Sequence, residues 1–169
     1  MQKNFEVHIR LVEQKDLNTV LLMNNEAVPA VNELNAEDLQ WYFEVANTFF
    51  VGEIDGEIVG FLVGLDGPGL PYESENYAWF SSRYEKFLYV DRVVVDSGIF
   101  SQGLGQLFYK KFIEDSSGYL FLCAEVNLRP RNERSLRFHE KFGFKPVGEQ
   151  DTNEGKKTVQ MLEYKISES

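Results

Sequence analysis

Apolar and polar residues alternate along the chain with two periods, which predicts a protein that contains both strands and helices. Period two, as in FEVHIRLV, is typical of a half-buried strand, whereas apolar residues three and four apart are typical of an amphipathic helix. Asp55-Gly56 lies between two apolar runs and predicts a tight antiparallel hairpin. In the first half of the chain these patterns predict a strand at about 5–11, a helix capped by Asp16, a helix beginning at Asn35 or Ala36, and strands at about 48–54 and 57–65.

The second half of the chain alternates strands with helices after a long connection. Residues 66–86 contain Pro, Gly and many aromatic residues, and we expect a long connection with one short helix there. Such a connection is either a functional lid or a packed surface excursion. The remaining patterns predict a strand at about 87–95, a helix at 103–115, a strand at about 119–126, a helix at 131–143 with Gly143 at its C-terminal cap, and two final strands in 144–150 and 156–166.

This order of elements predicts a mixed α/β sheet. The strand at 87–95 crosses through a helix to the strand at 119–126, and such a crossover joins parallel strands. The hairpin and the last two strands are expected to pair in the antiparallel sense. A length of 169 residues and a hydrophobic content of 43% are suited to one domain, 1–169, with a substantial core.

Composition narrows the classes of function. The formal net charge of −10 argues against binding of nucleic acid, because neutralising phosphates requires clusters of Lys and Arg. The acidic surface either keeps the protein soluble or favours a cationic amine substrate. Cys123 is the one cysteine, so neither an internal disulfide nor a thiolate zinc cluster is expected. The chain has no apolar leader and no run of about 18 apolar residues, so a cytoplasmic protein that does not bind the membrane is expected.

A glycine-punctuated loop, SGIFSQGLGQLFYKKF at 97–112, joins a predicted strand to a predicted helix. Gly98, Gly103 and Gly105 allow a ligand to approach the backbone closely, and the free N–H groups at a helix N-terminus attract anions. The loop has neither GxxxxGK[ST] nor GxGxxG, so it is not a nucleotide loop of the Walker or Rossmann type. Taken alone, it predicts either a phosphate cradle or an ordinary strand-to-helix turn.

A second motif, NERSLRFHEKFGF at 132–144, follows about thirty residues later. Asn132, Ser135 and His139 are spaced to share one face of a helix. A polar stripe that contains a titratable histidine is suited to a site. The alternative is that Asn132 only caps the helix and His139 is a half-buried surface residue.

The two motifs together resemble those of the GNAT superfamily of acetyl-CoA-dependent N-acyltransferases. The family loop has the pattern (Arg/Gln)-x-x-Gly-x-(Gly/Ala), and the chain reads Phe100-Ser101-Gln102-Gly103-Leu104-Gly105. The later family helix has the pattern Asn-x-x-(Ala/Ser)-x-x-x-Tyr-x-x-x-Gly-Phe, and the chain matches it from Asn132 to Phe144, with His139 at the Tyr position. The chain is also similar to a branch of uncharacterised predicted acetyltransferases in the segments YVDRVVV, EVNLRPRNERSLRFHEKFGF and GKKTVQML. The resemblance covers essentially the whole chain.

The resemblance implies a GNAT-like fold and a bound coenzyme. The fold would be a mixed, mostly antiparallel sheet with a central, splayed parallel strand pair and about four flanking helices. Pantetheine would lie in the splay, and the loop amides would bind the pyrophosphate. Because Phe100 replaces the usual Arg or Gln, binding would depend on the main chain. The implied coenzyme A contacts are Val93, Val94, Val95, Phe100, Ser101, Gln102, Gly103, Leu104, Gly105, Gln106, Asn132 and Ser135, and no metal is implied.

Acetyl transfer to an amine needs a base for the amine, a donor for the carbonyl oxygen and a proton for the departing thiolate. The resemblance places His139 near the sulfur, where it would act as an acid or as a positioning residue. Asp91 and Glu125 are the candidate bases, with an ion pair to Arg92 and a loop cap as their respective alternatives. In some members of the family ordered water takes this role. Cys123 lies among apolar residues and is expected to be an inert, buried thiol.

The acceptor is expected to be a small-molecule or peptide amine. Tyr77, Trp79 and Arg83 are candidates for binding it, although the aromatic residues of this connection are equally suited to packing the loop down. A homodimer is expected on family grounds only. The alternative function is a non-catalytic acyl-CoA-binding sensor or interaction module on the same fold, because a fold does not fix a function. A plain nucleotide-binding protein is the third hypothesis.

Overall fold

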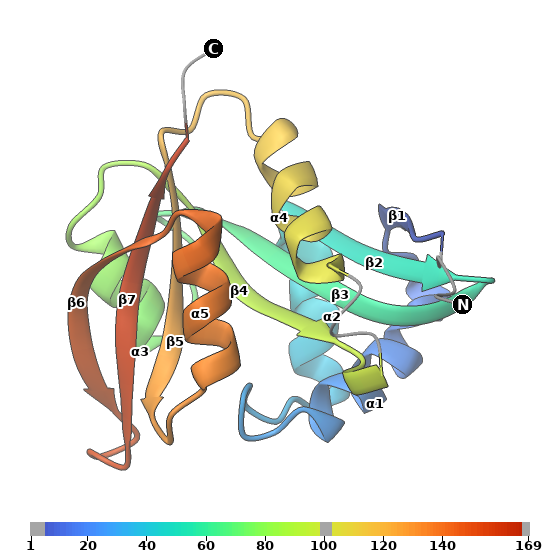
Figure 1. Ribbon diagram of the computed structural model, residues 1–169, viewed down its shortest axis with the longest axis horizontal. Coiled ribbons are helices and arrows are strands. Elements are labelled where there is room, and N and C mark those ends of the chain that lie inside the picture. Colours follow the sequence, from blue (N-terminus) through green and yellow to red (C-terminus); the bar gives the residue numbers. More distant parts are fainter. Residues whose placement is uncertain (1–5, 99–102, 167–169) are drawn as a thin grey trace. The chain divides into compact units, whose positions relative to one another are not determined.

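The computed structural model describes residues 6–98 and 103–166. Within them the protein is mixed α/β, with seven strands in one sheet in the order β1-β2-β3-β4-β5-β7-β6 (Figure 1). The pair β4–β5 is parallel, with Leu88 opposite Leu122 and Tyr89 opposite Cys123. The pairs β1–β2, β2–β3, β5–β7 and β6–β7 are antiparallel. The predicted fold class is therefore confirmed.

The chain divides into two compact units, each made of two segments, and they are described separately. Unit 1 comprises Met1–Leu65 and Asp91–Asp115, and unit 2 comprises Asp66–Val90 and Ser116–Ser169. Unit 1 contains β1 (His8–Leu11), the 3₁₀ helix η1 (Gln14–Asp16), α1 (Leu17–Glu26), α2 (Ala36–Val45), β2 (Thr48–Ile54), most of β3 (Glu57–Gly67), the second half of β4 (Phe87–Val95) and α4 (Leu104–Glu114). Unit 2 contains α3 (Glu75–Ser81), β5 (Phe121–Arg129), α5 (Glu133–Phe142), β6 (Lys145–Thr152), β7 (Lys157–Lys165) and the remaining parts of β3 and β4.

The turn and cap signals of the sequence are confirmed in all but one case. Asp55 and Gly56 have φ of 52° and 81° in the β2–β3 hairpin. Asn35 caps α2, because its side chain accepts from the N–H of Asp38 at 2.8 Å. Gly143 ends α5 with φ of 123°. Asp16 precedes α1 but does not cap it by its side chain, because its carboxylate binds Arg10 at 2.7 Å and accepts from the N–H of Glu13 at 2.8 Å instead.

Several strand boundaries differ from the prediction. β1 begins at His8, β3 continues to Gly67 instead of ending at 65, β5 covers Phe121–Arg129 instead of 119–126, and β6 continues to Thr152 instead of ending at 150. The short helix expected in the 66–86 connection is α3, which brings the described α-helices to five instead of about four. Strand ends are difficult to predict because pairing with the neighbouring strand decides where they lie.

Glycines in unit 1 allow α4 to lie close to β2 and β3. A Cβ placed on Gly64 would be 2.2 Å from Cζ of Phe112, and one on Gly60 would be 2.9 Å from Cδ2 of Leu104. Both of these α4 side chains are buried. The close approach holds the helix, and therefore its N-terminus, against the sheet of unit 1.

In unit 2, α3 and α5 cover opposite faces of β5 and β7. Successive side chains of a strand point to opposite faces, so Glu163 and Tyr164 of β7 face opposite ways. The ring of Phe142 on α5 lies 5.2 Å from the ring of Tyr164. Tyr84, just after α3, donates from its hydroxyl to Glu163 at 2.6 Å. Figure 1 shows the same order, with α5 in front of these strands and α3 behind them.

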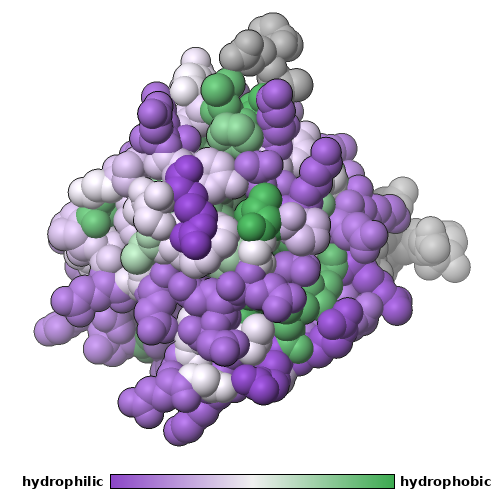
Figure 2. Space-filling model, turned by 90° about the vertical axis from the view of Figure 1, so that its left-hand side faces the viewer, coloured by the Kyte–Doolittle hydropathy of each residue, from purple (hydrophilic) through white to green (hydrophobic). Residues whose placement is uncertain are grey.

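The surface on the side of β6 and α3 is largely hydrophilic, with small and separate hydrophobic areas (Figure 2). Its character agrees with the formal net charge of −10, which is suited to a solvated surface. In the described part of the chain, no helix combines the length and the hydropathy that crossing a membrane requires.

Candidate active site

The start of α4 presents backbone N–H groups. Gly103 is the N-cap residue, with φ of 75° and ψ of 19°, a left-handed conformation that glycine adopts without the clash of a Cβ. Glycine has no side chain that could occupy the first-turn N–H groups of the helix. These groups and the positive end of the helix dipole can therefore bind an anion.

The other predicted coenzyme residues of unit 1 that the structure describes differ in exposure. Leu104 is buried, Gly105 is half-buried and Gln106 is exposed. Val93 and Val95 on β4 are half-buried, whereas Val94 is buried. Phe100, Ser101 and Gln102, which form the first part of the predicted loop, lie outside the described residues.

The residues of the second motif are linked to one another along α5. The side chain of Asn132 accepts from the N–H of Ser135 at 3.2 Å, so Asn132 does cap the helix. His139 Nδ1 lies 2.7 Å from the carbonyl oxygen of Ser135 and 3.3 Å from its Oγ. The predicted helix face therefore exists, and hydrogen bonds within the helix occupy part of its polar surface.

His139 is a buried imidazole and not a half-buried surface residue. The residue is 3% exposed, and its ring packs edge-on against Phe138 and Phe144 with centroids 5.2 and 5.0 Å away. Burial lowers the pKa of His139 to about 4, although the hydrogen bond with Ser135 opposes this shift. The ring is therefore neutral at pH 7. Because a carbonyl oxygen only accepts, the proton of the neutral ring is on Nδ1, and Nε2 is an acceptor.

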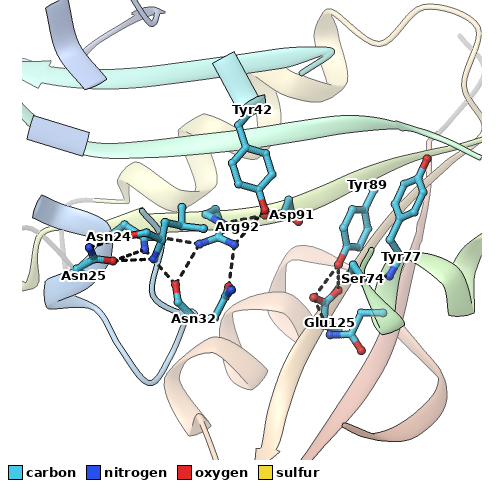
Figure 3. A network of polar contacts seen from close by, with 12 residues as sticks. Asn24, Asn25, Asn32, Tyr42, Ser74, Tyr77, Tyr89, Asp91, Arg92 and Glu125 are labelled. Carbon is cyan, nitrogen blue, oxygen red and sulfur yellow. Dashed lines mark hydrogen bonds and ion pairs between the residues drawn. The ribbon is translucent and has the colours of Figure 1, made fainter. Parts of the chain in front are cut away.

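Asp91, one of the two candidate bases, forms a buried ion pair. Its Oδ2 lies 2.8 Å from Nε of Arg92, and both side chains are 3% exposed. The guanidinium of Arg92 also donates to Oδ1 of Asn24 at 2.9 Å, to Oδ1 of Asn32 at 2.8 Å and to the hydroxyl of Tyr42 at 3.2 Å (Figure 3). Asp91 is thus one member of a polar network that fastens α1, α2 and the loop between them to β4 in unit 1.

Glu125, the other candidate base, lies in a different environment. Both of its carboxylate oxygens are 2.7 Å from the hydroxyl of Tyr89 (Figure 3). Its Oε1 also accepts from Nδ2 of Asn76 at 3.2 Å. Its described partners are neutral donors, unlike the cation that pairs with Asp91. Glu125 is half-buried on β5 in unit 2.

The structure does not bring His139 and Glu125 together. Glu125 lies on the face of β5 that α3 covers, since Asn76 of α3 donates to it. His139 lies on α5, which covers the opposite face of the same strands through Phe142 and Tyr164. The histidine and the carboxylate therefore cannot exchange a proton directly, and each can act only on groups that reach its own side.

The candidate acceptor residues on and after α3 are engaged with their own unit. Tyr77 is buried, and its hydroxyl donates to the carbonyl oxygen of Asp66 at 2.7 Å and accepts from the N–H of Leu70 at 3.2 Å. The guanidinium of Arg83 lies 3.7 Å above the ring of Trp79. These contacts show that the connection is packed down, which was one of the two expectations for it.

Cys123 is fully buried, and burial raises the pKa of its thiol. A buried thiol with a raised pKa is a poor nucleophile. The environment of Cys123 therefore agrees with the expectation of an inert thiol. Among the described residues, no group of three or more His, Cys, Asp or Glu side chains is arranged to hold a metal ion.

Sequence reasoning missed the partners of Glu125. Tyr89 is on β4 and Asn76 is on α3, 36 and 49 residues away from Glu125 in the chain. Gln150 of β6 donates from Nε2 to Oδ1 of Asn76 at 3.0 Å. No local motif marks these residues, and only the strand periodicity places Glu125 on one definite face of β5.

The mixed α/β fold carries the two motifs of an acyltransferase. The first is a strand followed by a helix that begins at a glycine, and the second is a later helix with a capping asparagine and a histidine. The family model of the acetyltransferase (GNAT) family matches residues 18–144. The chain belongs to this family, and the resemblance inferred from its motifs is confirmed. Its enzyme class is thus that of the acetyltransferases.

Solved structures share this fold at low sequence identity. NAA60 from Arabidopsis thaliana in complex with acetyl-CoA is 17% identical with a TM-score of 0.74, over 95% of this chain and 100% of that chain. The ribosomal-protein-S18-alanine N-acetyltransferase from Escherichia coli is 16% identical with a TM-score of 0.73, over 97% and 96%. An N-acetyltransferase from Staphylococcus aureus Mu50 is 20% identical with a TM-score of 0.71, over 96% and 99%. None of the curated proteins matches the chain.

Proposed function

We propose that the protein is an acetyl-CoA-dependent N-acetyltransferase that moves the acetyl group from the thioester to a primary amine by direct attack in a ternary complex. The observation that carries the proposal is the start of α4. There, a left-handed glycine, which has no side chain to cap the helix, directly precedes the first N–H groups of α4 in a chain of the GNAT family. The NAA60 structure with acetyl-CoA supports the choice of coenzyme.

The proposed coenzyme contacts come from the backbone and from the polar side chain of Asn132. The pyrophosphate would accept from N–H groups of residues 103–106, where the helix dipole favours an anion. The backbone of residues 93–95 would pair with the pantetheine arm. At the start of α5, the Oδ1 of Asn132 already accepts from Ser135, so its amide N–H₂ would be the group that donates to the coenzyme.

The reaction requires removal of a proton from the amine. The neutral nitrogen attacks the thioester carbonyl carbon, the C–N bond forms, the C–S bond breaks, and the thiolate leaves and is protonated. We assign the base to Glu125 and not to Asp91. The carboxylate of Asp91 is buried in an ion pair with Arg92, whereas Glu125 is half-buried and held by neutral donors. The proton from the amine would pass to Glu125 directly or through one water.

His139 fits a positioning role better than an acid role. Burial lowers its pKa to about 4, so a cationic ring is rare at pH 7. The remaining proton of the neutral ring is on Nδ1, which faces Ser135. His139 would therefore fix the start of α5 and offer Nε2 as an acceptor, and the proton for the thiolate would come from another donor or from water.

The acceptor class of the proposal is a small-molecule or peptide amine. Structures with similar folds include an enzyme named for the alanine of a ribosomal protein, which makes a peptide amine a reasonable member of the substrate panel. Binding of the acceptor amine by Tyr77, Trp79 and Arg83 stays a prediction. The cytoplasmic location and the homodimer also stay predictions.

The proposal is tested by incubating the protein with acetyl-CoA and a panel of amines and peptides and measuring release of the CoA thiol. Amine-dependent thiol release is expected. Binding of acetyl-CoA without release for any acceptor would favour the non-catalytic sensor. Comparable binding of ATP and coenzyme A would contradict the assignment of the coenzyme.

Gly103→Val tests the coenzyme site itself. A β-branched residue is strained at φ of 75°, so the helix start should change and calorimetric binding of CoA should fall at least tenfold. Gly155→Val is the matched control, because Gly155 has φ of 83°, nothing within 4 Å of a Cβ, and a place in the β6–β7 turn. Equal binding by both variants would show that the helix start has been misassigned.

A further inference from the structure

A chain of hydrogen bonds in unit 2 leads from an edge strand to the carboxylate of Glu125. Gln150 of β6 donates from Nε2 to Oδ1 of Asn76 at 3.0 Å, and Asn76 of α3 donates from Nδ2 to Oε1 of Glu125 at 3.2 Å. Tyr89 completes the set, with its hydroxyl 2.7 Å from both carboxylate oxygens. From this geometry we propose that Asn76 and Gln150 are positioning residues for the general base, an inference that rests on the proposed function.

The direction of the chain follows from the chemistry of an amide. The side chain of Asn76 has a donor end and an acceptor end, and a carboxylate can only accept. Because Gln150 donates to the acceptor end, the donor end of Asn76 faces Glu125. The reversed amide would place two oxygens together and would also leave Gln150 without its acceptor in Asn76. Gln150 thus fixes the orientation of Asn76, and Asn76 fixes one oxygen of Glu125.

The backbone around the chain is held by close packing. Trp79 is three residues after Asn76 on α3, and Gly148 is two residues before Gln150 on β6, so each pair shares a face. A Cβ on Gly148 would lie 2.5 Å from Cζ2 of Trp79, which shows how closely the indole lies on the strand. In addition, the Oγ of Ser74 accepts from the N–H of Tyr77 at 3.2 Å at the start of α3. Asn76 is therefore set in one place relative to β6.

Tyr89 is fixed as firmly as Asn76. Its side chain is 1% exposed, and its ring lies 5.6 Å from the ring of Tyr77 and 5.8 Å from that of Phe80. The carboxylate of Glu125 is thus held from two directions by groups that cannot move far. A base held in one rotamer loses little entropy when it meets the proton of the amine.

The groups near Glu125 define what its titration would report. Cys123 lies on the same face of β5, and Glu163 lies opposite Cys123 on β7. Met161 lies opposite Glu125 itself, and Tyr84 donates to Glu163. Burial raises the pKa of Cys123 and of Tyr84, so both stay neutral around pH 7. Loss of a hydrogen-bond donor to Glu125 should therefore shift the acidic limb of the pH–rate profile directly.

The experiment compares pH profiles of kcat/KM for the amine in single and double variants of the full chain. Asn76→Ala and Gln150→Ala should each lower kcat about tenfold, because one bond to a charged group is lost or misdirected. Bonds that a carboxylate accepts favour its ionised form, so the acidic limb should move up by roughly half a unit to one unit. KM for acetyl-CoA should not change. The double variant should match Asn76→Ala, because Gln150 acts through Asn76.

Gln160→Ala is the matched control. Gln160 of β7 lies opposite Glu149, so it faces away from Gln150, and its profile should coincide with that of the parent. Urea unfolding of every variant shows whether it is folded. If Asn76→Ala is not folded, Gln150→Ala is the deciding variant, because Gln150 lies on the exposed edge strand β6, where a substitution disturbs folding less. A parent-like acidic limb in Gln150→Ala, or additive losses in the double variant, would overturn the inference.

Glu125→Gln separates this inference from the proposed function. A loss of about a hundredfold or more in kcat is expected for removal of a general base. If Glu125→Gln is inactive while Asn76→Ala and Gln150→Ala behave like the parent, only the positioning inference is overturned. If Glu125→Gln is as active as the parent, the assignment of the base fails, and the positioning inference fails with it.

Discussion

At the scale of single residues, burial decides the chemistry that each candidate can perform. His139 has the reference pKa of an acid suited to neutral pH, yet its buried ring stays neutral until about pH 4. Asp91 and Glu125 are both carboxylates on strands, yet Asp91 is paired with the buried cation of Arg92, whereas the described partners of Glu125 are the neutral groups of Tyr89 and Asn76. Residue type alone would treat these groups as equivalent, whereas their partners assign them different roles.

The buried state of His139 predicts how stability depends on pH. The pKa is about 4 in the folded state and about 6.5 in the unfolded state, so the unfolded state binds more protons between these values. The free energy of unfolding should therefore fall as the pH falls below 6.5. At pH 5 the contribution from His139 is a loss of about 2 kcal/mol relative to pH 7.

Urea unfolding of the parent and of His139→Gln at pH 7 and pH 5 measures this contribution. The carboxylates titrate in both proteins, so the difference between the two losses isolates the histidine. The parent should lose about 2 kcal/mol more than the variant. Equal losses would show that His139 is accessible to protons in the folded state.

Asp91→Asn tests whether Asp91 is structural. The substitution leaves the buried guanidinium of Arg92 without its anion, so the free energy of unfolding should fall by about 3 kcal/mol. The pH profile of kcat/KM should keep the acidic limb of the parent, since the proposed base is Glu125. A stable variant that loses this limb would transfer the role of the base to Asp91.

At the scale of elements, glycines determine how closely α4 approaches the sheet of unit 1. Gly52, Gly60 and Gly64 each leave a space that side chains of α4 fill. The N-terminus of α4 is useful for binding only if the helix is held in place, and these contacts hold it. The packing of an apolar helix face is therefore linked to the proposed binding of a phosphate.

Gly64→Ala should destabilise the protein by about 1–3 kcal/mol, because its Cβ would lie 2.2 Å from the buried ring of Phe112. A double-mutant cycle with Phe112→Leu, followed by urea unfolding, provides the control. The smaller side chain makes room for the methyl group, so the double variant should be more stable than the sum of the two single losses predicts. Strictly additive losses would mean that α4 shifts as a whole to relieve the contact.

At the scale of the whole molecule, hydrophobic periodicity predicted the order of elements and the parallel β4–β5 pair. The order of elements, the Asp55-Gly56 turn and the Asn35 cap depend on neighbouring residues, and the parallel pair follows from the order of elements through the helical crossover. The network around Arg92 could not be predicted in this way. Arg92 contacts residues 50 to 68 positions earlier in the chain, and only the completed fold brings them together.

The candidate site shows the same division between local and distant information. The spacing of Asn132, Ser135 and His139 predicted a shared helix face, and hydrogen bonds along α5 now link these residues. The state of His139 depends on Phe144 and on burial under the helix, which spacing does not reveal. The described partners of Glu125 come from α3 and β4, and the residue that orients Asn76 comes from β6, so no sequence window contains them.

Glu125 and His139 lie on opposite faces of the strands of unit 2, so the surroundings of one can be engineered separately from those of the other. Odd-numbered positions of β5 from 121 to 127 face α3, and the even-numbered positions between them face α5. A library of variants restricted to the odd positions of β5 and to α3 would alter the surroundings of Glu125, while α5, which carries His139, keeps its packing. Insertion of a single residue in β5 before Glu125 would turn the side chains that follow it to the opposite face of the sheet. The register of this one strand therefore determines that Glu125 faces α3 and not α5.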